Sequence, residues 1–103
     1  MKVLVCGATG FIGRNIVEHL SKCSDIELVG IFNRRNAYEL PNLKWIKADL
    51  TVTTDINNIL DDIDIVIQAA ATTSGSKDIV SRPYIHVTDN VVMNSLLFRA
   101  IFE

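Results

Sequence analysis

Apolar and polar residues follow one another in blocks whose lengths predict alternating strands and helices. Residues 3–6 form a continuous apolar run that ends at Gly7. A short run without polar alternation is typical of a strand buried on both faces, as in a parallel sheet covered by helices. After a glycine-rich turn, apolar residues recur at helical spacing with polar residues between them, namely at Phe11, Ile12, Ile16, Val17 and Leu20. The start of the chain therefore predicts a buried strand followed by an amphipathic helix.

The same pattern continues to the end of the chain. Residues 26–32 and 43–47 predict two further strands, and Thr53 or Thr54 is placed to cap a short helix after them. A fourth strand is predicted at 63–67, and a long apolar-rich helix ends the chain. This order is typical of an open α/β fold in which a parallel sheet is flanked by helices. We expect the strand order 3-2-1-4, with ligands at the carboxyl ends of the strands.

Composition narrows the class of protein. A chain of 103 residues with 49% apolar and 21% charged residues predicts one globular domain. A net charge of -2 and a pI of about 5.6 argue against binding to nucleic acid or acidic membranes. Cys6 and Cys23 have no partners at metal-ligand spacing, so neither a disulfide scaffold nor a metal site is predicted. No apolar run approaches the roughly 20 residues of a membrane span, and we expect a soluble, cytoplasmic protein.

Gly7, Gly10 and Gly13 stand between the first predicted strand and the first predicted helix. Glycines in this context make a tight turn, admit a diphosphate against the backbone and let the helix pack closely on the strand. The helix start also offers free N–H groups and a positive dipole end to phosphates. A nucleotide-binding P-loop is excluded because no Gly-Lys-Ser/Thr follows. The remaining alternative is that these glycines only shape a turn.

The segment Gly-Ala-Thr-Gly-Phe-Ile-Gly at 7–13 resembles the Gly-x-x-Gly-x-x-Gly fingerprint of the extended short-chain dehydrogenase/reductases, the NAD(P)-dependent sugar epimerase/dehydratase group. The resemblance continues through 48–50, 66–71 and 90–97, and the last of these is most similar to the GDP-fucose synthase branch. It implies a Rossmann-type fold that binds a nicotinamide dinucleotide. The residues implied in binding are Gly7, Thr9, Gly10, Phe11, Ile12, Gly13, Asp49, Leu50, Ala69, Ala70 and Ala71.

Residues Asn33, Arg34 and Arg35 follow the second predicted strand, where they bear on the choice of dinucleotide. An acidic residue at this place usually holds the ribose hydroxyls of NAD, whereas arginine accommodates the 2′-phosphate of NADP. The first carboxylate after this strand is Glu39. A guanidinium can bind a phosphate bidentately and stack on adenine, so the sequence favours NADP, with NAD as the alternative. The competing interpretation is that both arginines lie in a solvated loop.

Two other implied sites carry alternatives of their own. The family's aspartate at the position of Asp49 contacts the adenine amino group, but this residue is equally suited to an Asx-turn. The small side chains at 69–71 permit close approach of the diphosphate and the nicotinamide ribose. Gln68 departs from the His or Asn that is common in the family.

The resemblance implies a catalytic Tyr-x-x-x-Lys pair. Its tyrosine exchanges a proton with the substrate oxygen while hydride moves to or from nicotinamide, and its lysine lowers the pKa of the tyrosine. Tyr38 and Tyr84 are the only tyrosines, and Asn42 and Thr88 stand four residues after them. Asn90 matches the family's helix asparagine, which supports the relay through a backbone-held water; the alternative is a helix-surface amide. We therefore expect this chain to bind dinucleotide but to have no turnover by itself.

The sequence ends inside an apolar helix without a glycine or proline stop. We interpret residues 1–103 as the NAD(P)-binding half-domain of a longer reductase or epimerase, whose nucleotide-sugar substrate would bind only to the full-length parent. The edge of the fourth strand at 63–69 and the surplus of apolar residues in the last helix predict a homo-oligomer. The alternatives are a non-catalytic NADP-sensing regulator and an oligomerising remnant without a ligand.

Overall fold

The computed structural model describes residues 1–70 and 84–102, and the side chains of residues 1–70 and 90–102. The elements of the described chain match the predicted order. They are β1 (Lys2–Cys6), α1 (Phe11–Leu20), β2 (Glu27–Phe32), β3 (Leu43–Lys47), α2 (Thr53–Ile59), β4 (Ile65–Gln68) and α4 (Tyr84–Phe102). The prediction of β4 begins too early, because Asp62 adopts a positive φ of 55° and turns the chain before the strand.

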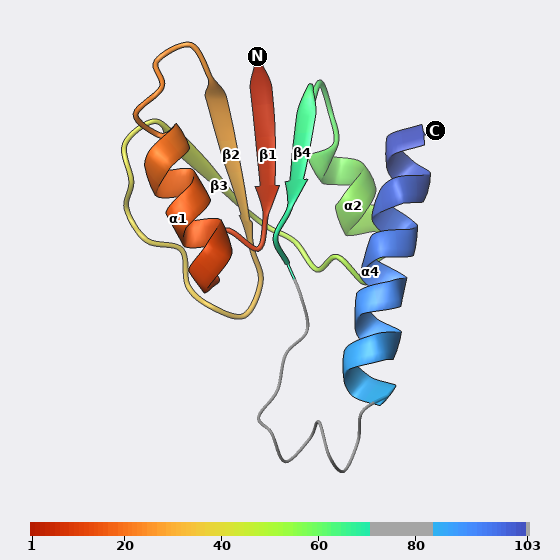
Figure 1. The fold of residues 1–103 in the computed structure, drawn as a ribbon. Coiled ribbons are helices and arrows are strands. Elements are labelled where there is room, and N and C mark those ends of the chain that lie inside the picture. Colours follow the sequence, from red (N-terminus) through yellow and green to blue (C-terminus); the bar gives the residue numbers. More distant parts are fainter. Residues whose placement is uncertain (71–83, 103) are drawn as a thin grey trace.

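The four strands form one parallel sheet in the order β3-β2-β1-β4, which confirms the predicted arrangement (Figure 1). Val5 of β1 pairs with Gly30 of β2 on one side and with Ile67 of β4 on the other. Because all strands run the same way, their carboxyl ends meet at one edge of the sheet. The loops that follow β1, β2 and β3, and residues 69–70 after β4, therefore lie at that edge, where ligands bind in open α/β sheets.

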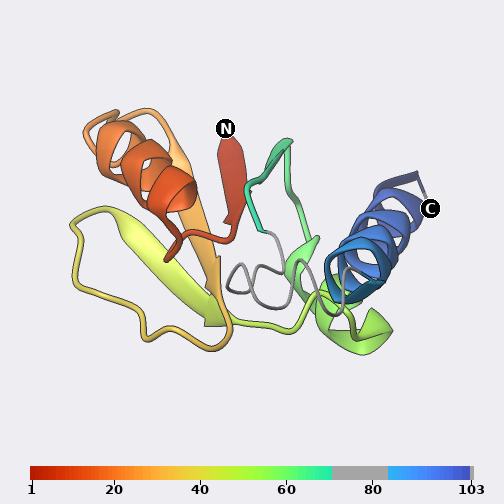
Figure 2. The ribbon, with the colours of Figure 1, turned by 60° about the horizontal axis from the view of Figure 1, so that its bottom comes forward.

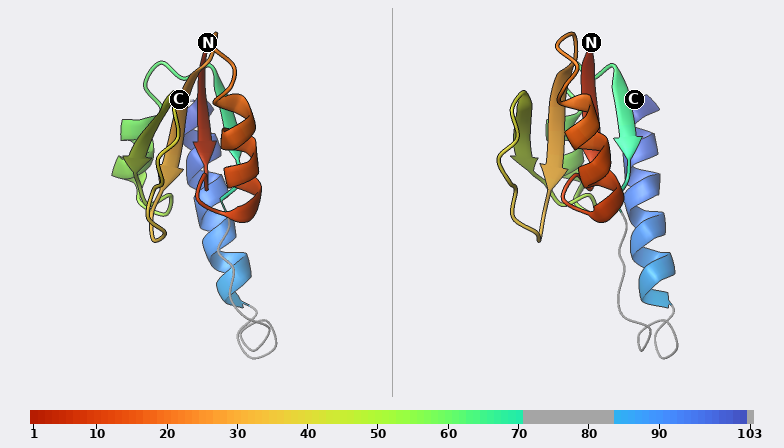
Figure 3. Two further views of the ribbon diagram at one scale, coloured as in Figure 1. Left: turned by 90° about the vertical axis from the view of Figure 1, so that its left-hand side faces the viewer. Right: turned by 60° about the vertical axis from the view of Figure 1, so that its left-hand side comes forward.

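Helices cover both faces of the sheet, as Figures 2 and 3 show. On one face, Val3 and Val5 of β1 pack with Val17 of α1. On the other face, Leu4 of β1 belongs to a core that includes Leu97 of α4. The continuous apolar run of β1 thus reflects burial on both faces, as predicted.

Two local predictions are wrong. Helical spacing places Phe11 and Ile12 on the apolar stripe of the first helix, but their side chains are 83% and 65% exposed. They lie in the first turn of α1, whose buried residues are Gly13 and Val17. The predicted threonine cap of α2 is also absent, since Val52 holds the N-cap position and makes no side-chain cap hydrogen bond.

The helix α4 has one buried and one exposed apolar face. Met93 and Leu97 are buried against the core that includes Ile56 and Ile59 of α2. Several large apolar side chains of α4 remain exposed: Val91, Val92, Phe98, Ile101 and Phe102. Among the described residues, none of the helices has the length and apolar character required to cross a membrane.

Candidate functional site

The turn after β1 is a tightly packed backbone structure. Gly7 has a φ of +72°, which favours glycine, and a Cβ there would lie 2.6 Å from both Cα and N of Ala70. A Cβ at Gly13 would overlap the carbonyl oxygen of Gly7 and lie 2.7 Å from its carbonyl carbon. The turn is thus held between the chain that leaves β4 and the first turn of α1. Gly7 and Gly13 are required by the packing of the chain itself.

Gly10 differs from its two neighbours in the motif. Its backbone is extended, with φ -77° and ψ 172°, and any residue adopts this conformation. A Cβ at Gly10 would lie 3.4 Å from the Gly7 carbonyl oxygen, an ordinary van der Waals contact. The described structure therefore gives no internal reason for a glycine at this position. A ligand that approaches the backbone of Gly10 closely would supply one.

The start of α1 has the character of an anion-binding site. Gly10 is the N-cap, no side chain among the described residues caps the helix, and the first turn contains no acidic residue. The N–H groups at such a terminus and the positive end of the helix dipole favour phosphate. Phe11 and Ile12 project beside this terminus with most of their surface exposed, and Thr9 in the turn is half-buried.

The loops after β2 and β3 bring predicted residues of opposite charge near each other. The side chains of Asn33, Arg34 and Arg35 are exposed after β2. Asp49 follows β3, and its Oδ1 accepts hydrogen bonds from Thr51 N at 2.9 Å and Thr51 Oγ1 at 2.7 Å. These bonds, with a smaller contribution from the Arg34 charge, hold the pKa of Asp49 below its ordinary value.

The geometry of Asp49 is that of an Asx-turn, the alternative that the sequence left open. One carboxylate oxygen is engaged by Thr51, and the backbone N–H of Asp49 donates to Oδ2 of Asp55 at 2.8 Å. The side chain of Leu50 is only 5% exposed and belongs to the core, so a ligand contact at that position would have to come from its backbone. Thr51 and Asp55 were not predicted, although the Asp-x-Thr spacing is a usual sign of such a turn.

The chain that leaves β4 forms the wall opposite the glycine turn. Ala69 N donates to Cys6 O at 3.1 Å, which continues the pairing of β4 with β1. Ala70 N donates to Oε1 of Gln68 at 3.0 Å, and Nε2 of Gln68 donates to Oδ1 of Asn94 at 3.1 Å. Neither the motifs nor the periodicity of the sequence indicates this link to α4. Asn90, the predicted catalytic support, is half-buried one turn earlier on the same helix. Ala71 lies outside the described residues.

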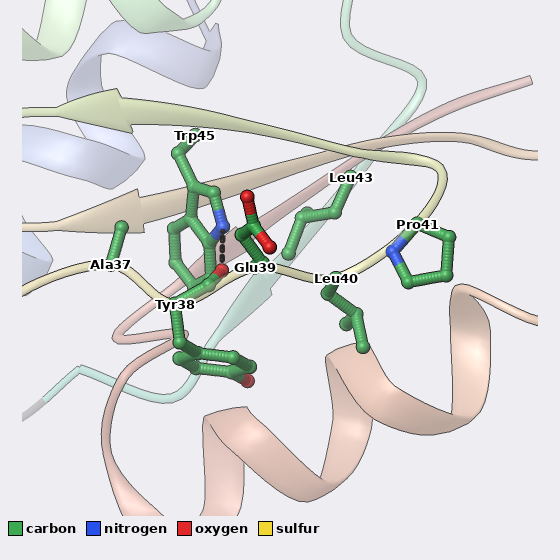
Figure 4. A pocket seen from close by; sticks show the side chains of 7 residues that line it. All are labelled: Ala37, Tyr38, Glu39, Leu40, Pro41, Leu43 and Trp45. Atoms are coloured by element: carbon green, nitrogen blue, oxygen red, sulfur yellow. Dashed lines mark hydrogen bonds between the residues drawn. The ribbon is translucent and has the colours of Figure 1, made fainter.

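A separate hollow is lined by Leu43 and Trp45 of β3 and by residues 37–41 before it (Figure 4). Its volume is about 700 Å³ and it is open to solvent. Nε1 of Trp45 donates to the carbonyl oxygen of Tyr38 at 2.7 Å, and the Arg14 guanidinium lies 4.3 Å from the centre of the Tyr38 ring. This packing anchors the connection between β2 and β3 on α1. None of the predicted dinucleotide-binding residues lines the hollow.

Residues 3–103 match the model of the NAD dependent epimerase/dehydratase family. The chain belongs to this family. The resemblance carried by the glycine motif is thus confirmed for the epimerase/dehydratase family as a whole. It is not confirmed for the GDP-fucose synthase branch in particular.

Two known proteins are similar to parts of the chain. An uncharacterized UDP-glucose epimerase of Bacillus subtilis is 31% identical over 84 residues, covering 69% of this chain and 26% of the relative. A UDP-2-acetamido-2,6-beta-L-arabino-hexul-4-ose reductase of Pseudomonas aeruginosa is 46% identical over 43 residues, covering 42% of this chain and 12% of the relative.

A solved structure of the same class is similar over nearly all of the chain. The UDP-glucuronic acid 4-epimerase of Bacillus cereus, in complex with UDP-glucuronic acid and NAD, has a TM-score of 0.78 and 28% identity. The comparison covers 97% of this chain and 36% of the epimerase. The chain therefore spans about a third or less of the length of these relatives.

Proposed function

We propose that residues 1–103 form the dinucleotide-binding portion of an epimerase, dehydratase or reductase that acts on a nucleotide sugar. The observation that carries this proposal is Gly10, a glycine that the packing of the described residues does not require, at a start of α1 that no described side chain caps. Membership of the epimerase/dehydratase family supports the proposal. The Bacillus cereus relative supports it too, since its structure contains NAD and UDP-glucuronic acid.

The residues fit a dinucleotide in three places along the carboxyl edge of the sheet. The backbone at Gly10 and the start of α1 would bind the diphosphate. The small residues Ala69 and Ala70 would form the wall beside it, and the loops that carry Arg34 and Asp49 would hold the adenosine end. When bound, the nicotinamide supplies hydride transfer. We assign Asn90 a supporting role toward that chemistry, and the 103-residue sequence contains no Tyr-x-x-x-Lys pair.

Within this proposal, NADP is the preferred dinucleotide and NAD is the alternative. Arg34 and Arg35 are exposed at the end of β2, and the charge of Arg34 acts on the Asp49 carboxylate across the adenosine region. Two guanidinium groups can bind a 2′-phosphate, whereas neither is required by the ribose hydroxyls of NAD. A cytoplasmic location is part of this proposal.

The test is a calorimetric titration of the chain with NADPH and with NADH. We expect Gly10→Ala to weaken the binding of both dinucleotides by about tenfold or more, because the added methyl group occupies the place of the diphosphate. Its melting temperature should stay close to that of the wild type, because the position has room for a Cβ. Unchanged affinity in a folded Gly10→Ala variant would contradict the proposal.

Replacement of both arginines tests the choice of dinucleotide. Arg34→Ala/Arg35→Ala should weaken NADPH binding by about 10- to 100-fold, the loss expected for charge-assisted hydrogen bonds, and leave NADH binding nearly unchanged. Lys44→Ala/Lys47→Ala is the matched control, since it removes the same charge from exposed residues of β3. Equal losses for NADPH and NADH would reject the preference for NADP while leaving dinucleotide binding intact.

We also infer that the chain forms homo-oligomers through α4. The support is the exposed apolar face of this helix, which includes Phe98 and Phe102. The outer edge of β4 is the alternative contact, because only its β1 side is paired within the described chain.

A further inference from the structure

A side-chain bridge joins the end of β4 to α4. Gln68 is the last residue of β4, and its side-chain amide makes one hydrogen bond to α4 and one to the backbone that follows β4. Its Nε2 donates to Oδ1 of Asn94 at 3.1 Å, and its Oε1 accepts from the backbone N–H of Ala70 at 3.0 Å. Both bonds are partly buried, so each is worth more than an equivalent bond in open solvent.

The bridge holds the backbone at the point where it touches the glycine turn. Ala70 is the residue whose N and Cα would lie 2.6 Å from a Cβ at Gly7. After the bond from Ala69 N to Cys6 O, the chain leaves the sheet. The Gln68 amide then provides the partner of the next N–H group. A change in that bond would therefore move the wall that faces the turn.

The helix side of the bridge is fixed by the core. Asn94 lies on α4 between Met93 and Leu97, and both of these are buried. Oε1 of Gln68 accepts from Ala70 N, so Nε2 of Gln68 must face α4. There the side-chain oxygen of Asn94 is the acceptor. The orientation of the two amides is thus determined by the bonds around them.

We propose that Gln68 and Asn94 are positioning residues of the dinucleotide site. Together they set how closely the wall at Ala69 and Ala70 approaches the glycine turn, and so the room for the diphosphate and the nicotinamide half. The adenosine end, near Arg34 and Asp49, lies in the loops after β2 and β3 and does not depend on the bridge. This inference rests on the proposed function, because it assigns two residues to the same site.

The bridge can be tested directly through the amide proton of Ala70. Gln68→Met keeps the length of the side chain but removes both bonds, and it should abolish the hydrogen-exchange protection of Ala70 measured by NMR. Gln68→Glu keeps the acceptor for Ala70 and lets the Asn94 amide rotate to donate, so protection should return. Asn94→Leu removes only the hydrogen bond between Gln68 and α4, and it serves as a second variant if Gln68→Met does not fold.

The role in binding is tested with NADPH and with adenosine 2′-monophosphate, which has the adenine and the 2′-phosphate but no diphosphate. Gln68→Met should weaken NADPH binding by about tenfold, the effect of one or two lost hydrogen bonds, and leave the affinity for the monophosphate unchanged. Gln68→Glu should restore NADPH binding. Asn42→Asp is the control, since it removes a partly buried amide bond to Ser21 O outside the site and should not change either affinity.

The possible failures are distinguishable. Wild-type chain that binds neither NADPH nor NADH overturns the proposed function, and this assignment with it. Wild-type binding with unchanged affinity in Gln68→Met overturns only the assignment. Equal loss of NADPH and the monophosphate also overturns it, because a general structural defect would then explain the effect.

Discussion

At the scale of single residues, the loop after β3 shows how hydrogen bonds from a neighbouring residue lower the pKa of a carboxyl group. The pKa of Asp49 is lowered chiefly by the hydrogen bonds from Thr51. Because this pKa is lower in the folded chain than in the unfolded one, Asp49 contributes stability above the ordinary aspartate pKa of about 3.9. That contribution is lost as the pH falls through the pKa of the folded state.

Thr51→Val should therefore raise the pKa of Asp49 toward its ordinary value. The substitution removes the Oγ1 donor at 2.7 Å and keeps the backbone donor at 2.9 Å, so the shift should be partial. The loss of stability on acidification should still begin near the ordinary aspartate pKa, but it should be smaller than in the wild type and should be complete at a higher pH. NMR titration of the Asp49 carboxyl carbon measures the shift, with Thr54→Val as a control on an exposed threonine. Identical titration curves for wild type and Thr51→Val would contradict this account.

Individual site residues were only partly predictable for a physical reason. Gly7 and Gly13 followed from the motif because the positive φ of Gly7 and the contact of Gly13 with Gly7 both belong to a turn that is local in sequence, whereas the contact of Gly7 with Ala70 is not. The motif and the resemblance also indicated Asp49, but not which of its two alternatives the chain would adopt. The bridge from Gln68 to Asn94 joins residues 26 positions apart, so it depends on where α4 lies against β4. Sequence periodicity does not contain that information.

At the scale of elements, α4 divides its apolar residues between two environments. Leu97 is 1% exposed in the core shared with α2, whereas the adjacent Phe98 is 56% exposed. Leu97→Ala should lower the free energy of unfolding by about 2–5 kcal/mol, because it leaves a cavity in a closed core. Phe98→Ala should change it by no more than about 0.5 kcal/mol. Urea denaturation at low protein concentration, where association contributes little, compares the two; similar losses would mean that both faces of α4 are covered.

The elements themselves were largely predictable because their patterns reflect burial in the sheet. The apolar run of β1 is continuous since Val5 packs toward α1 while Leu4 packs toward α4. In the first turn of α1, apolar spacing does not reflect burial, because Phe11 and Ile12 lie at the carboxyl edge of the sheet, beyond the core. Apolar residues that periodicity assigns to the core but the fold leaves exposed at a ligand edge are candidates for ligand contact. Phe11 and Ile12 therefore stay predicted contacts of the dinucleotide, as the family resemblance implies.

At the scale of the whole molecule, the exposed face of α4 leads to a prediction about assembly. Sedimentation velocity at high micromolar concentration should show dimers or larger species. Phe98→Glu/Phe102→Glu should shift the chain to monomer, because two charges would have to be buried at the contact. Ile65→Lys, which places a charge beside the outer edge of β4, should leave the oligomer intact.

The two substitutions separate the two candidate contacts, since each changes only one of them. If only Ile65→Lys dissociates the oligomer, the contact is at the outer edge of β4 and the exposed face of α4 takes no part in it. A wild-type monomer at this concentration would contradict both contacts. If α4 is the contact, Asn94 lies on the helix that joins one copy to the next, and its bond to Gln68 would connect the assembly to the glycine turn. The dissociated Phe98→Glu/Phe102→Glu chain should then bind NADPH more weakly than the wild type, although neither phenylalanine belongs to the proposed site.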